Sequence, residues 1–143
     1  MKKAGFLAIA LALSLSLQAQ TSDSTTFKGY IYNDEYQVYI DMDFYHNNKT
    51  VPGQEIFGEL PGYFGANRDT RKWLFTSAEI TDSTTAKLGI SNDYGSEDLE
   101  ATLKKKPDGT FELHQDKGST IKIAVNRKWV KIPKDLIFIR KGK

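Results

Sequence analysis

Over the ten residues from Tyr36 to Tyr45, apolar side chains alternate with a second set that is more polar. Alternation of this kind is the signature of a β-strand with one buried face, because successive side chains of a strand point to opposite sides. The segment therefore predicts a strand with an apolar face toward a core. The inward set is Tyr36, Val38, Ile40, Met42 and Phe44, and the outward set is Gln37, Tyr39, Asp41, Asp43 and Tyr45.

Short segments of strand character follow one another along the rest of the chain. Turn residues separate them, most clearly at Lys106–Gly109, where a proline presets one turn dihedral and a glycine takes a positive φ. No segment beyond the N-terminal residues has the periodicity of a helix. The further predicted strands cover residues 27–32, 54–60, 72–80, 85–91, 99–103, 111–113, 121–125, 129–132 and 136–139.

Strands joined by compact turns favour antiparallel neighbours, and a meander of this length can close on itself and so remove its exposed edges. We predict an all-β fold, a single small antiparallel β-barrel of about eight strands. A two-sheet β-sandwich is the alternative. The layout resembles that of lipocalin-like barrels, but the early Gly-x-Trp element of that family is missing, so no ligand is carried over from it.

Three segments have more specific expectations. Residues 61–69 combine a proline, two glycines and two adjacent aromatics, which predicts a structured loop. The 54–60 strand should point Ile56 inward, and residues 116–118 should form a turn. The apolar run 136–139 predicts a strand that is buried on both faces or that closes a sheet.

The N-terminus has the anatomy of a secretory signal peptide over residues 1–19. Lys2 and Lys3 precede an apolar run over residues 6–17, which is too short to span a bilayer, and Ala19 stands at the expected cleavage edge. Residues 20–26 are expected to be a flexible lead-in, and residues 27–143 a single β domain. We therefore expect an exported protein, periplasmic or secreted and soluble, with no transmembrane segment in the mature chain.

The chain contains no cysteine. Its absence excludes lipoprotein acylation, disulfides, a thiol nucleophile and cysteine-ligated metal. Charge is unevenly distributed: residues 20–116 hold 9 basic and 17 acidic residues, and residues 117–143 hold 9 basic and 1 acidic. This asymmetry can mark a binding surface, and the alternative is that basic C-terminal strands neutralise acidic neighbours.

No conventional catalytic or metal-binding motif occurs in the sequence, so we expect a non-enzyme without a cofactor. Asp41 and Asp43 lie two apart on one strand face, a spacing compatible with glycoside hydrolysis, and the alternative is a solvated strand face. His46 and His114 belong to no spaced motif. They are expected to be separate surface residues and would form a metal site only if the fold brought them together.

The predicted binding site lies in and beside the 61–69 loop. Aromatic faces, guanidinium groups and an amide can stack on a ligand or anchor a protein partner. The alternative is that the aromatics fold back and plug the end of a barrel. The predicted site residues are Tyr63, Phe64, Asn67, Arg68, Arg71 and Trp73.

Three functions are compatible with these features. The first is an exported non-enzymatic binding module for a small ligand, glycan or protein. The second is an inhibitor or envelope assembly component that acts through its surface, and the third is a small glycoside hydrolase. Nucleic acid is not an expected partner, although basic residues at 104–106 and 127–143 could face an anionic envelope surface or polysaccharide. Candidate glycosylation signals occur at residues 23–25, 48–50 and 82–84.

Overall fold

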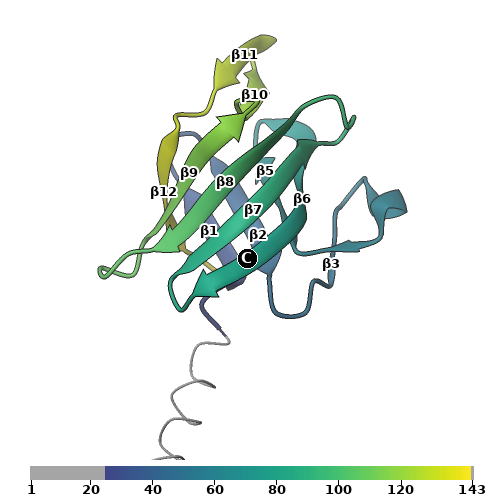
Figure 1. Ribbon diagram of the computed structural model, residues 1–143. Coiled ribbons are helices and arrows are strands. Elements are labelled where there is room, and N and C mark those ends of the chain that lie inside the picture. The colour runs from purple at the N-terminus through teal and green to yellow at the C-terminus, as the bar shows by residue number, and fades with distance from the viewer. Residues whose placement is uncertain (1–24, 143) are drawn as a thin grey trace, which may run out of the picture.

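The computed structural model describes residues 25–142, and the predicted signal peptide, residues 20–24 of the lead-in and Lys143 lie outside this range. The described chain is a closed barrel of eight antiparallel strands in the order β1-β12-β9-β8-β7-β6-β5-β2 (Figure 1). This confirms the predicted β-barrel over the sandwich. Within residues 25–142, no helix is both long and apolar enough to cross a membrane.

Two short excursions leave the barrel. One runs through β3 (Lys49–Thr50), the 3₁₀ turn η1 (Glu55–Phe57) and β4 (Glu59–Leu60), and the other is the hairpin of β10 (Lys122–Val125) and β11 (Lys128–Lys131). The barrel strands are β1 (Lys28–Asn33), β2 (Val38–Asp43), β5 (Gly62–Ala66), β6 (Asp69–Asp82), β7 (Thr85–Asn92), β8 (Asp98–Lys105), β9 (Phe111–Gly118) and β12 (Asp135–Arg140).

The last strand closes the barrel. β12 pairs with β1, with Ile31 opposite Arg140, and with β9, with Leu136 opposite Leu113. Leu136 and Phe138 are buried, whereas Ile137 and Ile139 on the other face are exposed. The sequence correctly predicted a closing strand, but the alternative of burial on both faces is wrong because nothing described covers the outside of β12.

The interior of the barrel is filled with side chains. The inward residues predicted on β2 are fully buried there, and they meet aromatic rings from the other strands, with Phe27 stacked on Phe44 and Phe64 edge-on to Phe138. Burial of this apolar surface is the main stabilising term of the fold. The large side chains below 2% exposure include Phe27, Phe64, Phe75, Phe111, Phe138, Ile31, Ile40, Met42, Ile90, Leu103, Leu113 and Ile121.

The segment predicted as a loop is instead largely a barrel strand. β5 is buried along its whole length between β2 and β6. Its glycines serve close packing: a Cβ on Gly62 would lie 2.5 Å from the carbonyl oxygen of Asp41, and one on Gly65 would lie 2.5 Å from the ring of Tyr39. The glycines that suggested a loop are therefore those that let the strands approach each other.

The predicted 54–60 strand is also wrong. Gly53 and Gly58 have φ of 81° and 72°, and the chain between them turns outward, so only Glu59 and Leu60 pair with β3. Ile56, expected to face inward, is 91% exposed. Positive φ at both ends interrupts the extended conformation that the alternation required.

The first excursion covers part of the outer face of the barrel. Val51, Tyr63 and Leu74 are buried in a small apolar cluster there, and Tyr39 and Leu60 pack against it. The barrel therefore has a main core inside and a second, smaller one outside, beneath β3 and β4.

Candidate functional site

The structure separates the six residues of the predicted site. Phe64 and Trp73 belong to the barrel core, and Tyr63 belongs to the outer cluster. The three aromatics are thus buried, but within the barrel strands β5 and β6 and not as the plug at the end of the barrel that the alternative described. Asn67 and Arg68 lie exposed in the β5–β6 turn, where the Asn67 side chain donates to the Tyr32 hydroxyl at 2.9 Å.

Arg71 borders a groove of about 290 Å³ at one end of the barrel. The groove lies between the start of β6, the β7–β8 turn and the β10–β11 hairpin. It is lined by aromatic and charged side chains, among them Arg71, Trp73, Tyr94, Glu97, Lys122 and Trp129.

The β10–β11 hairpin forms one wall and is held firmly against the barrel. The indole N–H of Trp73 donates to the carbonyl of Lys122 at 3.2 Å, and the backbone N–H of Ala124 donates to Asp69 at 2.8 Å. Ile123 is buried in the core beneath the hairpin. These contacts leave Trp129, on β11, 58% exposed beside the groove.

The β7–β8 turn forms the other wall. The side-chain carbonyl of Asn92 accepts the backbone N–H groups of Ser96 at 2.9 Å and Glu97 at 3.2 Å, which closes the turn. Tyr94 stands at its tip and is 80% exposed. An Asx-type closure of this kind orders the loop without burying Tyr94.

Two cations meet the ring of Trp129. The guanidinium carbon of Arg71 lies 4.7 Å from the ring centroid, and the ammonium of Lys122 lies 5.5 Å from it. Lys122 also forms an ion pair with Glu97 at 3.1 Å. Cation–π attraction and the ion pair together order the long side chains that line the groove.

Apolar exposure continues from the groove toward the first excursion. Tyr94 also borders a second hollow of about 190 Å³, which Phe57 and Leu60 line. Phe57 is 48% exposed. We call Phe57, Tyr94 and Trp129 the aromatic strip; within residues 25–142 they are three of the seven exposed large hydrophobic side chains.

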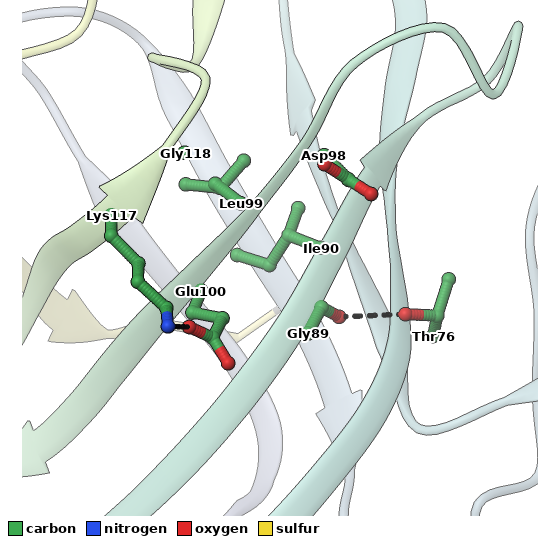
Figure 2. A pocket seen from close by; sticks show the side chains of 8 residues that line it. All are labelled: Thr76, Gly89, Ile90, Asp98, Leu99, Glu100, Lys117 and Gly118. Atoms are coloured by element: carbon green, nitrogen blue, oxygen red, sulfur yellow. Dashed lines mark hydrogen bonds and ion pairs between the residues drawn. The ribbon is translucent and has the colours of Figure 1, made fainter.

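A larger hollow of about 450 Å³ lies on the outer face of β7, β8 and β9. Figure 2 shows that an ion pair crosses it, between Lys117 and Glu100 at 3.0 Å, and that Thr76 donates to the carbonyl of Gly89 at 3.1 Å. Ile90 and Leu99 are buried beneath it. No aromatic side chain lines this open surface, so the groove beside Trp129 is the stronger candidate.

The paired aspartates are buried rather than solvated, and each is 3% exposed. Asp41 forms an ion pair with Lys49 at 3.1 Å and accepts from the Tyr63 hydroxyl at 3.5 Å. Asp43 accepts the backbone N–H groups of Tyr45 and His46, at 3.1 and 3.0 Å. The alternative of a solvated strand face is therefore wrong. Both carboxylates instead bind groups in the segment that follows β2.

Burial acts to raise the pKa of Asp43, but hydrogen bonds from His46 and Tyr45 outweigh it and lower the pKa below its usual value. A general acid for glycoside hydrolysis needs a raised pKa instead. Because the folded pKa is depressed, Asp43 contributes stability above the unfolded value of about 4, and this contribution is lost as the pH falls through the folded value.

We therefore expect the difference in unfolding free energy between wild type and Asp43→Asn to shrink as the pH falls from about 5 to about 3. Urea denaturation at several pH values would measure it. A difference that stays the same at pH 3 would contradict the assignment of these hydrogen bonds to an ionised Asp43.

The two histidines bind different carboxylates. The His46 ring contacts Asp43 at 3.0 Å, and His114 on β9 contacts Asp135 on β12 at 2.5 Å. The hydrogen bond with Asp135 raises the pKa of His114. In the part of the chain that the structure describes, no three histidine or carboxylate side chains are grouped so as to hold a metal ion.

The basic residues are also divided. Lys104–Lys106 lie at the β8–β9 turn, at the end of the barrel away from the β10–β11 hairpin (Figure 1). Arg140 donates to the backbone carbonyls of Lys28 and Thr26. The C-terminal basic segment therefore does not form one continuous surface.

Tyr94, Lys122 and Trp129 line the groove but were not among the predicted site residues. The signal that could have found the two aromatics is their place beside turns: Tyr94 stands between Asp93 and Gly95, and Trp129 follows closely on Asn126. Large apolar residues in otherwise polar turns are frequently binding residues.

The comparisons add no relative to this picture. No protein-family profile, no curated protein sequence and no solved structure matches the chain. The site is therefore interpreted from its own geometry.

Proposed function

We propose that this protein is an exported, non-enzymatic binding module that docks a protein partner through the aromatic strip. It would act from its surface, as an inhibitor or as an envelope assembly component. The observation that carries the proposal is the exposure of Trp129 and Tyr94 on the two walls of the groove and of Phe57 in the neighbouring hollow. Interface hot spots are enriched in tyrosine, tryptophan and arginine, and exposed apolar patches commonly mark partner sites.

The packed core supports a surface mode of action. Because large side chains fill the barrel, a ligand held inside would have to displace rings such as Phe64 and Phe75, which are at most 1% exposed. Displacing them would forfeit the burial that stabilises the fold. The groove and the strip instead lie on turns carried by a rigid barrel, a common arrangement for binding sites.

A second candidate is the binding of a saccharide in the groove. Tyr94 and Trp129 both line it, and Asn92, Asp93 and Ser96 supply polar groups beside them. An aromatic face together with amide and carboxylate groups can stack on a sugar ring and bond its hydroxyls. Binding of neutral oligosaccharides that is lost in Tyr94→Ala would favour this candidate over a protein partner.

The protein-partner proposal can be tested by site-specific photocross-linking in the producing organism. With p-benzoylphenylalanine at position 94, we expect one discrete cross-linked species. With the same residue at Ile139, which is 48% exposed on β12 but outside the strip, we expect none.

Two further variants make the result decisive. Trp129→Ala should reduce the yield of cross-linking at position 94 at least about fivefold, because truncating a hot-spot residue commonly costs more than 1 kcal/mol of binding. Ile137→Ala, on the exposed face of β12, should leave the yield unchanged. Equal cross-linking from positions 94 and 139, or none from position 94, would overturn the proposal.

A further inference from the structure

We infer that the partner presents a carboxylate to Arg71, on an acidic peptide segment that enters the groove between Tyr94 and Trp129. The inference rests on the proposed function and specifies the chemistry of the partner. It follows from which cations in the groove already form an ion pair with a carboxylate of the protein and which do not.

Of the cations that line the groove, Arg71 and Lys72 form no ion pair among residues 25–142, and of these two only Arg71 is held against an aromatic ring. Its guanidinium lies over the Trp129 ring at 4.7 Å, and among residues 25–142 no carboxylate lies within ion-pair distance of it. The neighbouring Asp69 is committed elsewhere, since its two oxygens accept the backbone N–H groups of Arg71 and Ala124 at 3.1 and 2.8 Å. Lys122, in contrast, is already neutralised by Glu97.

The contact with the Trp129 ring preorganises the Arg71 side chain for binding a carboxylate. A guanidinium stacked on an indole loses conformational freedom before any ligand arrives, while its N–H groups remain in the plane that a carboxylate can bind bidentately. Preorganisation of this kind reduces the entropy lost on binding. Trp129 thus has a positioning role for Arg71 in addition to its own contact area.

The hairpin adds a long-range attraction for anions. Arg127, Lys128 and Lys131 are exposed, and in the described part of the chain none of them forms an ion pair. Uncompensated charge of one sign raises the local concentration of an oppositely charged partner and speeds its association. The groove itself is lined by three cations, Arg71, Lys72 and Lys122, against two carboxylates, Asp93 and Glu97, so the charges of the hairpin add to a small positive excess that attracts an acidic ligand.

The neighbouring apolar hollow favours a peptide as the source of the carboxylate. Tyr94 borders both cavities, so a ligand anchored at Arg71 can place its next group against Phe57 and Leu60. A chain with alternating acidic and apolar side chains supplies both contacts. A uronic-acid polymer supplies the carboxylate but no apolar side chain for the second hollow.

The test uses a short acetylated and amidated peptide of alternating glutamate and leucine, followed by NMR of the ¹⁵N-labelled protein. We expect the peptide to shift the Arg71 side-chain N–H and the Trp129 indole N–H, and its affinity to fall as salt is added. The matching glutamine–leucine peptide should bind at least about tenfold more weakly. Arg71→Gln should abolish this preference for glutamate.

The controls separate charge, geometry and folding. Lys104→Gln removes one positive charge at the other end of the barrel and should keep the full preference. Arg71→Lys keeps the charge but loses the bidentate geometry, so it should restore only part of the preference. Unchanged amide dispersion in each variant establishes that the barrel is folded.

Three outcomes would overturn the inference. They are equal binding of the glutamine peptide, retention of the glutamate preference in Arg71→Gln, and binding of oligogalacturonate without binding of the glutamate peptide. Cross-linking at position 94 that is insensitive to Arg71→Gln would leave the proposed protein partner standing and remove only its acidic character. Absence of cross-linking from position 94 when Arg71 is intact would instead remove the partner.

Discussion

Replacing Phe64 with alanine should lower the free energy of unfolding by about 3–5 kcal/mol, because it empties a large space in a closely packed core. Phe64 is 1% exposed, and its ring lies edge-on to Phe138 with 6.5 Å between the centroids. It stands opposite Ile40 on β2 and Trp73 on β6, so the substitution removes packing contacts toward both neighbouring strands. Equilibrium denaturation in urea would measure the loss.

The matched control is Tyr94→Ala, which removes an aromatic side chain that is 80% exposed and should change stability by no more than about 0.5 kcal/mol. Tyr63→Ala and Trp73→Ala should be destabilising like Phe64→Ala, since both residues are buried. Such losses for all three would assign the aromatics of the predicted site to the fold. A loss below about 1 kcal/mol for Phe64→Ala would contradict the packed interior.

Replacing Gly118 with alanine should cost about 2–4 kcal/mol, from backbone strain and overpacking together. Gly118 has a φ of 101°, a conformation that residues with a side chain rarely adopt. A Cβ there would lie 2.7 Å from the carbonyl oxygen of Asp98 and 2.8 Å from the Cα of Leu99. Both contacts are with backbone, so β8 and β9 would have to separate.

Gly142→Ala is the comparison for this prediction, because a Cβ at Gly142 would meet nothing within 4 Å. Its effect on the thermal midpoint should be negligible, whereas Gly118→Ala should lower the midpoint by many degrees. Similar midpoints for the two variants would show that β8 and β9 do not approach each other as closely as described.

Gly118 also illustrates where sequence reasoning failed. Residues 116–118 were expected to form a turn, yet they complete β9, and the register shifts between Glu100 and Ala101. An acidic residue, a lysine and a glycine in succession are typical of a turn. In this case Asp116 is the extra residue of a β-bulge and Gly118 pairs with Leu99. Local composition does not distinguish such a bulged strand from a turn.

A second bulge explains the mixed pattern of β6. Trp73 and Phe75 point inward, the register then shifts before Ser77, and Ala78 packs against the core. Period-two alternation would have placed the apolar residues on opposite faces, because a one-residue insertion exchanges the faces of everything that follows. The bulge places Ala78 on the same side of the sheet as Trp73 and Phe75, whereas Leu74 lies in the outer cluster.

The candidate site was predicted only in part. Arg71 and Trp73 were among the predicted residues and do line the groove. Trp129, on which Arg71 stacks, lies far along the chain, on a hairpin that docks through Trp73 and Asp69. Tyr94 reaches the same place from the β7–β8 turn. No local sequence pattern predicts that the start of β6, the β7–β8 turn and the β10–β11 hairpin meet at one end of the barrel.

The sequence by itself determined the class of fold and the face that each regular strand buries. The inward residues of β2 are an example, because alternation and apolar burial are local consequences of strand geometry. The tertiary structure alone decided that Asp41 is covered by an excursion, that β5 is a strand, and that Arg71 and Trp129 stack. The physical reason is that a period of two specifies which side of a strand is apolar, whereas bulges, close glycine contacts and barrel closure specify which distant residues become neighbours.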